Sequence, residues 1–310
     1  MPIGKRRPSH PRLVAIAIDL RRSKRCHVST NMKFKAPDVA ALAADQPKTV
    51  WGKLLSSTPV VLTVVATLMA GLSNSEMTRA QYDRSLAAQQ QSKVGDQWSF
   101  FQAKRLRSAT LRGNFQVLQS TIDLGSLDAG ALRGVAGTAM PEANLNAALE
   151  SLTRTEVPAF QAKSAITPEI KTALEAVAAG KLETEVTQLL HAVKSEELET
   201  ALQTAQANAR GLDATVSPVT QAIDQLEKAV SAKLATDRDS VRALGRNFTA
   251  ARLRFDAARY DTEARFNRGI AELLELRVRL SNISADRHHV RSQRFFFGML
   301  AAQQIGRAHV

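Results

Sequence analysis

The chain has 310 residues, of which aromatic side chains make up 5%, and it carries a formal net charge of +13. Ala, Leu, Gln, Glu, Lys and Arg dominate the composition. Because these side chains lose little rotamer freedom in a helix, we expect an all-α fold and exclude a framework of sheet. The single cysteine, Cys26, excludes an intrachain disulfide framework and a cysteine zinc site.

More than half of the excess charge lies in residues 1–31, which hold eight basic side chains against one acidic residue, Asp19. A basic arm can bind phosphates, but this arm has no aromatic residue for stacking on bases, and no nucleic-acid-binding motif follows it. We therefore expect no nucleic-acid partner. Residues 1–53 are predicted to be a disordered basic tail, and Met32 is an alternative start of the natural chain.

Residues 54–75 form an uncharged stretch of 22 residues between Lys53 and Glu76. At about 1.5 Å per residue, a helix of this length reaches roughly 33 Å, close to the hydrocarbon thickness of a bilayer. We predict a transmembrane helix here, with the lipid bilayer as a partner. Two alternatives stay open: a buried core helix, and a cleaved signal sequence if translation starts at Met32, although no convincing cleavage site follows.

A row of apolar side chains at a spacing of seven residues predicts the first coiled-coil helix over residues 76–123. The row consists of Val94, Phe101, Phe115 and Ile122, and Ser108 interrupts it. Four glycines then precede Pro141, so residues 124–140 are predicted to form a Gly-rich hinge.

Residues 141–237 are rich in alanine and are predicted to form a helical insertion between two long helices. Thr167 precedes Pro168, and Ser217 precedes Pro218. Each pair places a capping hydroxyl before a proline in the first helical position. We therefore predict that one helix begins at Pro168 and another at Pro218.

A single long helix is predicted over residues 238–304. About sixty residues of helix would extend roughly 90 Å, so this helix should pair with the helix of residues 76–123, antiparallel to it, or with another chain. The prediction rests on a heptad row formed by Val241, Phe248, Phe255, Leu276, Ile283, Val290 and Phe297.

The end of the chain contains a second apolar run, which starts near Phe295. The last six residues, 305–310, match the translation of a common sequencing adapter. We therefore expect that the natural protein continues into a second membrane segment.

Two motifs carry a resemblance to a known family. They are the segment Asp96-Gln97-Trp98-Ser99-Phe100-Phe101-Gln102-Ala103-Lys104 and the segment from Asp286 to Leu300. Together with the preceding span, they resemble the DUF4337 family of bacterial membrane proteins, a domain of unknown function, over about residues 50–122 and 240–303. The resemblance implies a helical, coiled-coil middle followed by a hydrophobic hairpin, and it implies no activity.

Two sets of side chains are candidate sites. The first is a partner-binding or packing anchor, consisting of Asp96, Gln97, Trp98, Phe101, Gln102 and Lys104. The second is a membrane-interface set, in which long basic side chains reach the headgroup layer; it consists of Arg287, His288, His289, Arg291 and Arg294.

No catalytic, cofactor-binding or metal-binding motif accompanies these two sets, so we expect neither an enzyme nor a bound cofactor. The adjacent histidines point about 100° apart on a helix and cannot chelate a metal from one face.

The leading functional hypothesis is a membrane-anchored helical scaffold that self-associates as a homo-oligomer through its coiled-coil helices. The alternative is a membrane-linked sensor or small-ligand-binding module in the helical insertion. The expected location is the bacterial inner (cytoplasmic) membrane. The arginines after residue 286 add positive charge to the middle region and favour the cytoplasmic side for it.

Overall fold

A computed structural model describes residues 50–137 and 141–308 of the chain. The chain divides into two units, Met1–Ser56 and Ser57–Val310, and every described side chain belongs to the second unit. Seven α-helices and no strand form the described ranges, which confirms the all-α prediction. Most of the predicted basic tail, including Cys26 and Met32, lies outside the described residues.

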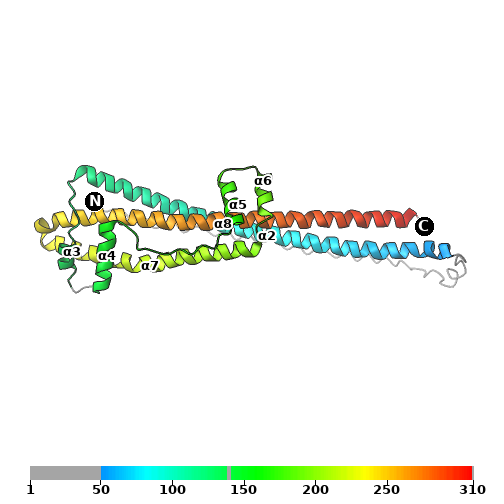
Figure 1. Ribbon diagram of the computed structural model, residues 1–310, viewed down its shortest axis with the longest axis horizontal. Helices are drawn as coiled ribbons and strands as arrows, with labels where there is room; N and C mark the ends of the chain where they lie inside the picture. Colours follow the sequence, from blue (N-terminus) through cyan, green and yellow to red (C-terminus); the bar gives the residue numbers. More distant parts are fainter. Residues whose placement is uncertain (1–49, 138–140, 309–310) are drawn as a thin grey trace, which may run out of the picture. The chain divides into compact units, whose positions relative to one another are not determined.

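Two long helices run side by side in opposite directions (Figure 1). The first, α2, extends from Val50 to Thr121, and the second, α8, extends from Arg238 to Ala308. Near one end the Ser73 hydroxyl donates to the Ser292 carbonyl at 3.0 Å, and further along the Ser108 hydroxyl donates to the Ala257 carbonyl at 2.9 Å. Thirty-five residues separate the two contacts on each helix. The register is therefore constant over five heptads, and the predicted pairing of the two long helices is confirmed.

Small buried side chains form the interface between these helices, which we call the small-residue seam. Hydroxyl-to-carbonyl bonds across it show that the two backbones approach closely, as small residues permit. Every member of the seam is less than 9% exposed. On α2 the members are Ala66, Ser73, Ala80, Ala87, Val94 and Ser108, and on α8 they are Ala257, Ala264, Ala271, Val278, Ala285 and Ser292.

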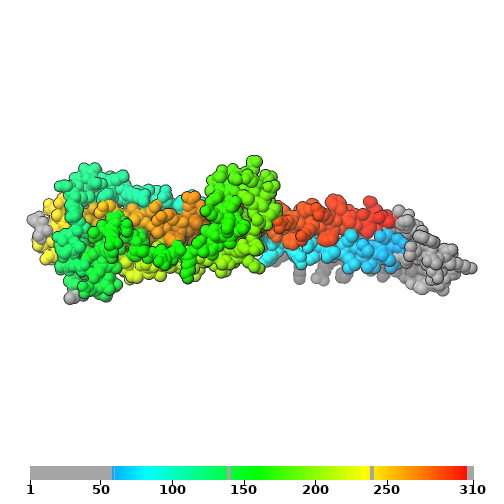
Figure 2. All heavy atoms as spheres, in the orientation of Figure 1, coloured from blue at the N-terminus to red at the C-terminus, as the bar shows by residue number. Residues whose placement is uncertain are grey.

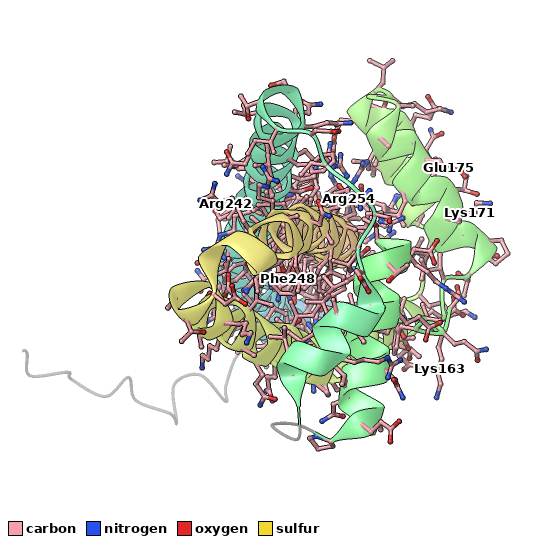
Figure 3. The ribbon with its side chains drawn as sticks, turned by 90° about the vertical axis from the view of Figure 1, so that its left-hand side faces the viewer. Lys163, Lys171, Glu175, Arg242, Phe248 and Arg254 are labelled. Carbon is pink, nitrogen blue, oxygen red and sulfur yellow. The ribbon has the colours of Figure 1, made fainter. Side chains whose placement is uncertain are left out.

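The larger apolar side chains of α8 face a different neighbour. Helix α7, Ser195–Thr236, runs antiparallel to α8, and Asp237 alone joins the two helices. Phe248 and Phe255 pack in one core cluster with α7 and with two short helices, α3, Ala129–Ala136, and α4, Glu142–Arg154. Figure 3 shows Phe248 among the helices. Phe248 and Phe255 of the predicted heptad row thus belong to the core of the helical insertion, whereas Val290 and Phe297 of the same row are exposed.

A second core cluster surrounds two more short helices, α5, Pro168–Ala178, and α6, Glu183–Leu190. Thr167 caps α5 by accepting a hydrogen bond from the Ile170 N–H, and Pro168 is its first residue, so the predicted helix start is confirmed. Both short helices project from the side of the long ones (Figure 2). Among the described residues, only α2 and α8 continue beyond α5 and α6 toward one end of this unit.

The prediction that a helix begins at Pro218 was wrong, because α7 runs through this proline. Proline in a helix interior costs about 3 kcal/mol through its missing N–H and its ring. Burying an apolar side chain of the size of Val or Ile contributes roughly 1.5–3 kcal/mol. Val216, Val219 and Ile223 are buried around the proline, so tertiary packing outweighs the local preference.

The predicted hinge over residues 124–140 contains a helix of its own, α3. The Asp128 carboxylate caps α3 by accepting a hydrogen bond from the Ala131 N–H at 2.9 Å. Leu132 on α3 is completely buried in the core cluster of α7 and α8. A short capped helix therefore occupies part of the Gly-rich stretch.

Candidate functional site

The apolar end of the α2 and α8 pair leaves its large side chains exposed. In the described part of the chain, α2 alone has a segment long and apolar enough to span a membrane. Only 11% of the apolar window is buried. The exposed side chains of α2 in this segment are Val60, Val61, Val64, Leu68 and Leu72, and those of α8 beside it are Phe296, Phe297, Leu300 and Ile305.

A polar junction joins the two helices where the predicted span ends. Ser73 and Ser292 are buried, and each hydroxyl donates to the other residue's carbonyl, at 3.0 and 2.9 Å. The imidazole of His288 lies 2.6 Å from the carboxylate of Glu76, the first charged residue after the span. Both side chains are largely buried between α2 and α8. His288 is therefore placed between the helices rather than pointing outward.

The junction makes the stability of the fold depend on pH. The hydrogen bond from His288 is the main cause that lowers the pKa of Glu76 from its ordinary value of 4.5, and the positive charge of Arg79 acts in the same direction. A lowered pKa stabilises the folded state at every pH above the unfolded value, and this contribution is lost as the pH falls through the folded value. The junction should therefore weaken below about pH 4.5.

We predict that Glu76→Gln lowers the melting temperature at about pH 7, and that its difference from the parent shrinks in acid below about pH 4.5. Thermal unfolding followed by circular dichroism in detergent measures both values. Glu150→Gln is the matched control, because Glu150 forms an exposed ion pair with Arg154 of the same helix, α4. If the melting temperatures of Glu76→Gln and the parent differed equally at neutral and acid pH, the stabilising role of the ionised Glu76 would be contradicted.

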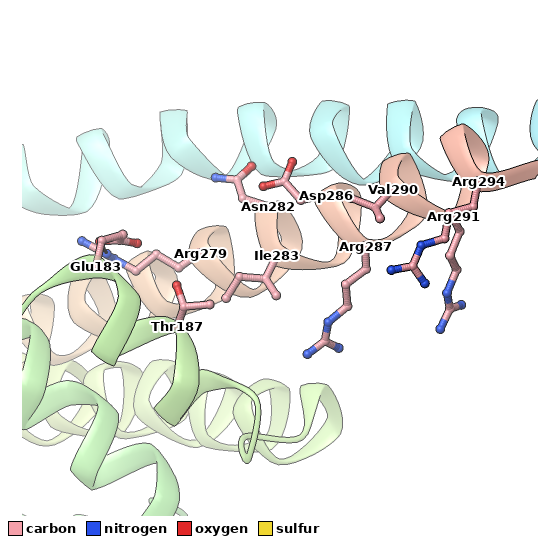
Figure 4. A pocket seen from close by; sticks show the side chains of 10 residues that line it. All are labelled: Glu183, Thr187, Arg279, Asn282, Ile283, Asp286, Arg287, Val290, Arg291 and Arg294. Atoms are coloured by element: carbon pink, nitrogen blue, oxygen red, sulfur yellow. Dashed lines mark hydrogen bonds and ion pairs between the residues drawn. The ribbon is translucent and has the colours of Figure 1, made fainter. Parts of the chain in front are cut away.

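Four arginines of the same helix face line a groove between α6 and α8, which we call the arginine groove (Figure 4). The groove has a volume of about 550 Å³. Arg279, Arg287, Arg291 and Arg294 line it from α8, and Glu183 contributes from α6. Three of the predicted membrane-interface residues thus come together in one place. His289, half-buried on α8, is not among the residues that line the groove.

A polar pocket of about 420 Å³ lies where α2, α7 and α8 meet. Asp96 and Gln97 of the predicted anchor line it. Gln90 is only 4% exposed, and the side-chain oxygens of Gln90 and Gln97 have no hydrogen-bond partner among the described residues. Buried amide oxygens normally have a partner, so this pocket has the capacity to accept hydrogen bonds from a small molecule or from water.

The remaining anchor residues pack inside the unit. The rings of Trp98 and Phe101 meet edge to face at 5.5 Å, and Trp98 packs against the core cluster of α5 and α6. Lys104 forms an ion pair with Glu263 of α8 and lies over the ring of Tyr260. Gln102 is exposed on α2. The six predicted residues therefore do not form one surface: two line the polar pocket, three pack between helices and one faces outward.

Sequence reasoning missed several residues of these sites. Glu183 and Gln90 line the arginine groove and the polar pocket, and neither belongs to a motif. The alanines of the seam continue the predicted row of Val94 toward the span at the same seven-residue spacing, so this signal was present in the sequence. Within the described ranges, no group of three or more His, Cys, Asp or Glu side chains could hold a metal ion.

Comparison with known proteins gives one family. The model of DUF4337, a domain of unknown function, matches residues 51–131, which confirms the predicted resemblance to this family over α2 and the start of α3. The match ends at residue 131, so the resemblance over residues 240–303 stays a prediction. No curated protein and no solved structure matches the chain.

Proposed function

We propose that this protein is a membrane-anchored helical scaffold, in which the apolar end of α2 and α8 lies in a bilayer. The observation that supports the proposal most is the exposure of the apolar side chains of α2 between Val60 and Leu72. A contiguous apolar surface of this kind is unfavourable in water, whereas lipid tails accept it. Extraction of membranes with alkaline carbonate tests the anchor: the chain should stay in the pellet, and its release would contradict the proposal.

The aligned end of α8 supports the same anchor. Ser292 lies opposite Ser73, so the run that begins at Phe295 lies beside the predicted span of α2. Gly298 approaches Met69 so closely that an added Cβ would lie 2.8 Å from the sulfur. Close approach at glycine is typical of helices that pack within membranes. Both helices therefore contribute apolar surface to one anchor.

Self-association is the second part of the proposal, and the outer face of α2 is its proposed site. Leu106 and Val117 are 69% and 63% exposed, and they lie eleven residues, or about three turns, apart on one side of the helix. Two copies of this face would bury these side chains against each other. The face lies beyond the predicted span, where water surrounds an unpaired copy.

A cysteine at this face should crosslink two copies. We expect Val117→Cys, in a Cys26→Ser background, to give a disulfide-linked dimer when the detergent-solubilised protein is oxidised. Lys228→Cys on the exposed face of α7 is the matched control and should stay monomeric at the same protein concentration. Equal yields of dimer from the two variants, or monomer only from both, would contradict self-association through α2.

The polar pocket favours a second function, which is the binding of a small molecule between α7 of the helical insertion and the two long helices. The two unpaired amide oxygens support it, since a ligand with hydrogen-bond donors would satisfy them. Native mass spectrometry of the purified full chain should then show a bound small molecule that Gln90→Leu loses. Identical spectra of the two proteins, without added mass, would contradict this function.

A further inference from the structure

The charges of the arginine groove are not balanced by its own carboxylates. Arg279 is paired with Glu183 at 2.5 Å and with Glu275 at 3.2 Å, and Asp286 is paired with Arg84 of α2 at 3.4 Å. Both carboxylates that line the groove are therefore already in ion pairs. Three cationic side chains remain.

Those three side chains are Arg287, Arg291 and Arg294, and none has a carboxylate within 4.0 Å in the part of the chain that the structure describes. Their spacing of four and three residues places them on one face of α8. Among the described residues, the hydrogen-bond partner of Arg287 is the imidazole of His191, which supplies no negative charge. All three are exposed. The charge of Arg291 also acts on the more distant carboxylate of Glu76. The groove therefore presents three arginines that no described carboxylate pairs directly.

The position of the groove indicates where the anion comes from. Ser292 lies between Arg291 and Arg294 and bonds to Ser73, two residues before the predicted span ends at residue 75. The arginine side chains thus leave α8 near the end of the apolar surface. In a bilayer, the phosphates of the lipid headgroups occupy that level. Ile283 and Val290 add apolar lining for the glycerol part of a lipid.

From these observations we propose that the arginine groove binds the phosphate of an anionic phospholipid. Guanidinium groups are suited to this ligand, because their planar N–H donors match two phosphate oxygens. The inference rests on the proposed membrane anchor and adds a specific partner to it. A soluble phosphate compound has the same chemistry, but the end of the span beside the groove favours the lipid.

The test uses the detergent-solubilised full chain and a water-soluble short-chain phosphatidylglycerol, with the dissociation constant measured by microscale thermophoresis. An arginine near an anionic surface contributes about 1 kcal/mol, which corresponds to about fivefold in affinity. We therefore expect the triple variant Arg287→Gln, Arg291→Gln and Arg294→Gln to bind about a hundredfold more weakly. The charge-matched control changes three exposed arginines elsewhere to glutamine, Arg133, Arg154 and Arg210, and should bind like the parent.

Three results would overturn the inference. Equal binding of phosphatidylcholine with the same chain length would show that the negative charge is not recognised. Equally tight binding of inorganic phosphate would assign the groove to a soluble ligand. Equal weakening in the two triple variants would show a nonspecific effect of charge. If any of these occurs while the chain resists carbonate extraction, the groove proposal fails and the membrane anchor stands.

Discussion

Val64→Arg together with Leu68→Arg should release the chain from the membrane fraction. Both side chains are exposed, at 55% and 63%, and lie near the middle of residues 54–75. An arginine at the centre of a membrane helix costs about 2.5–3.5 kcal/mol, so the pair costs roughly 5–7 kcal/mol. The seven Val and Leu residues that remain in the span contribute only about −2 to −4 kcal/mol. Insertion of α2 alone would therefore become unfavourable, and the fraction resistant to carbonate should fall severalfold.

The control for this result is the same substitution on the same helix outside the predicted span. Val117 is 63% exposed, like Leu68, but lies on α2 well beyond residue 75, where the predicted span ends. Val117→Arg should leave carbonate resistance unchanged. Circular dichroism in detergent should show the parent's helix content for both variants, since none of the three positions is buried. Equal membrane retention of the double variant and the parent would contradict the anchor.

The long helices were predictable because large apolar side chains mark their rows. Phe248 and Phe255 stand seven residues apart, and both turn out to be buried in one core cluster. The pairing of the two long helices was one of two expected arrangements, because a helix of this length needs a partner along it, either in the same chain or in another. The sequence did not indicate which neighbouring helix each row contacts. The row of Phe248 faces α7, whereas a second row of small residues faces α2.

The small-residue seam was missed because alanine gives little hydrophobic contrast in a chain rich in alanine. Ser108 interrupts the apolar row of Val94 in the sequence, yet it is 2% exposed and donates to the Ala257 carbonyl. In a close-packed antiparallel pair, a serine fits the row as well as alanine does, since its hydroxyl reaches the facing backbone. Small residues at a spacing of seven continue the row of Val94 as far as Ala66.

The candidate site was predictable only in part, because its walls come from distant segments. Arg287, Arg291 and Arg294 stood out as a basic cluster beside an apolar run. The other wall of the groove, α6, lies 96 residues earlier in the sequence, where Glu183 pairs with Arg279. A single sequence gives no signal for such a contact. The same limit applies to the polar pocket, whose unpaired glutamines, Gln90 and Gln97, come from α2 and whose other walls come from α7 and α8.

Ala87→Leu should destabilise the fold by about 1–3 kcal/mol, because extra methylenes in a close-packed interface force the helices apart. Ala87 is 4% exposed and belongs to the same core cluster as Val278. In a unit of this size, each kcal/mol lowers the melting temperature by roughly 2–4 °C, which thermal unfolding in detergent can measure. Ala88→Leu is the adjacent control: Ala88 is exposed, and the substitution should change stability by less than about 0.5 kcal/mol.

A second substitution tests the register of the seam. Ala87 lies fourteen residues beyond Ser73 on α2, and Val278 lies fourteen residues before Ser292 on α8, so the two should face each other. Val278→Ala alone creates a cavity and should cost about 1–2 kcal/mol. Combined with Ala87→Leu, it makes room for the added methylenes, so the double variant should be more stable than the sum of the two single effects predicts. Additive effects would mean that the two side chains do not meet. The constant register between α2 and α8 would then not hold at Ala87 and Val278.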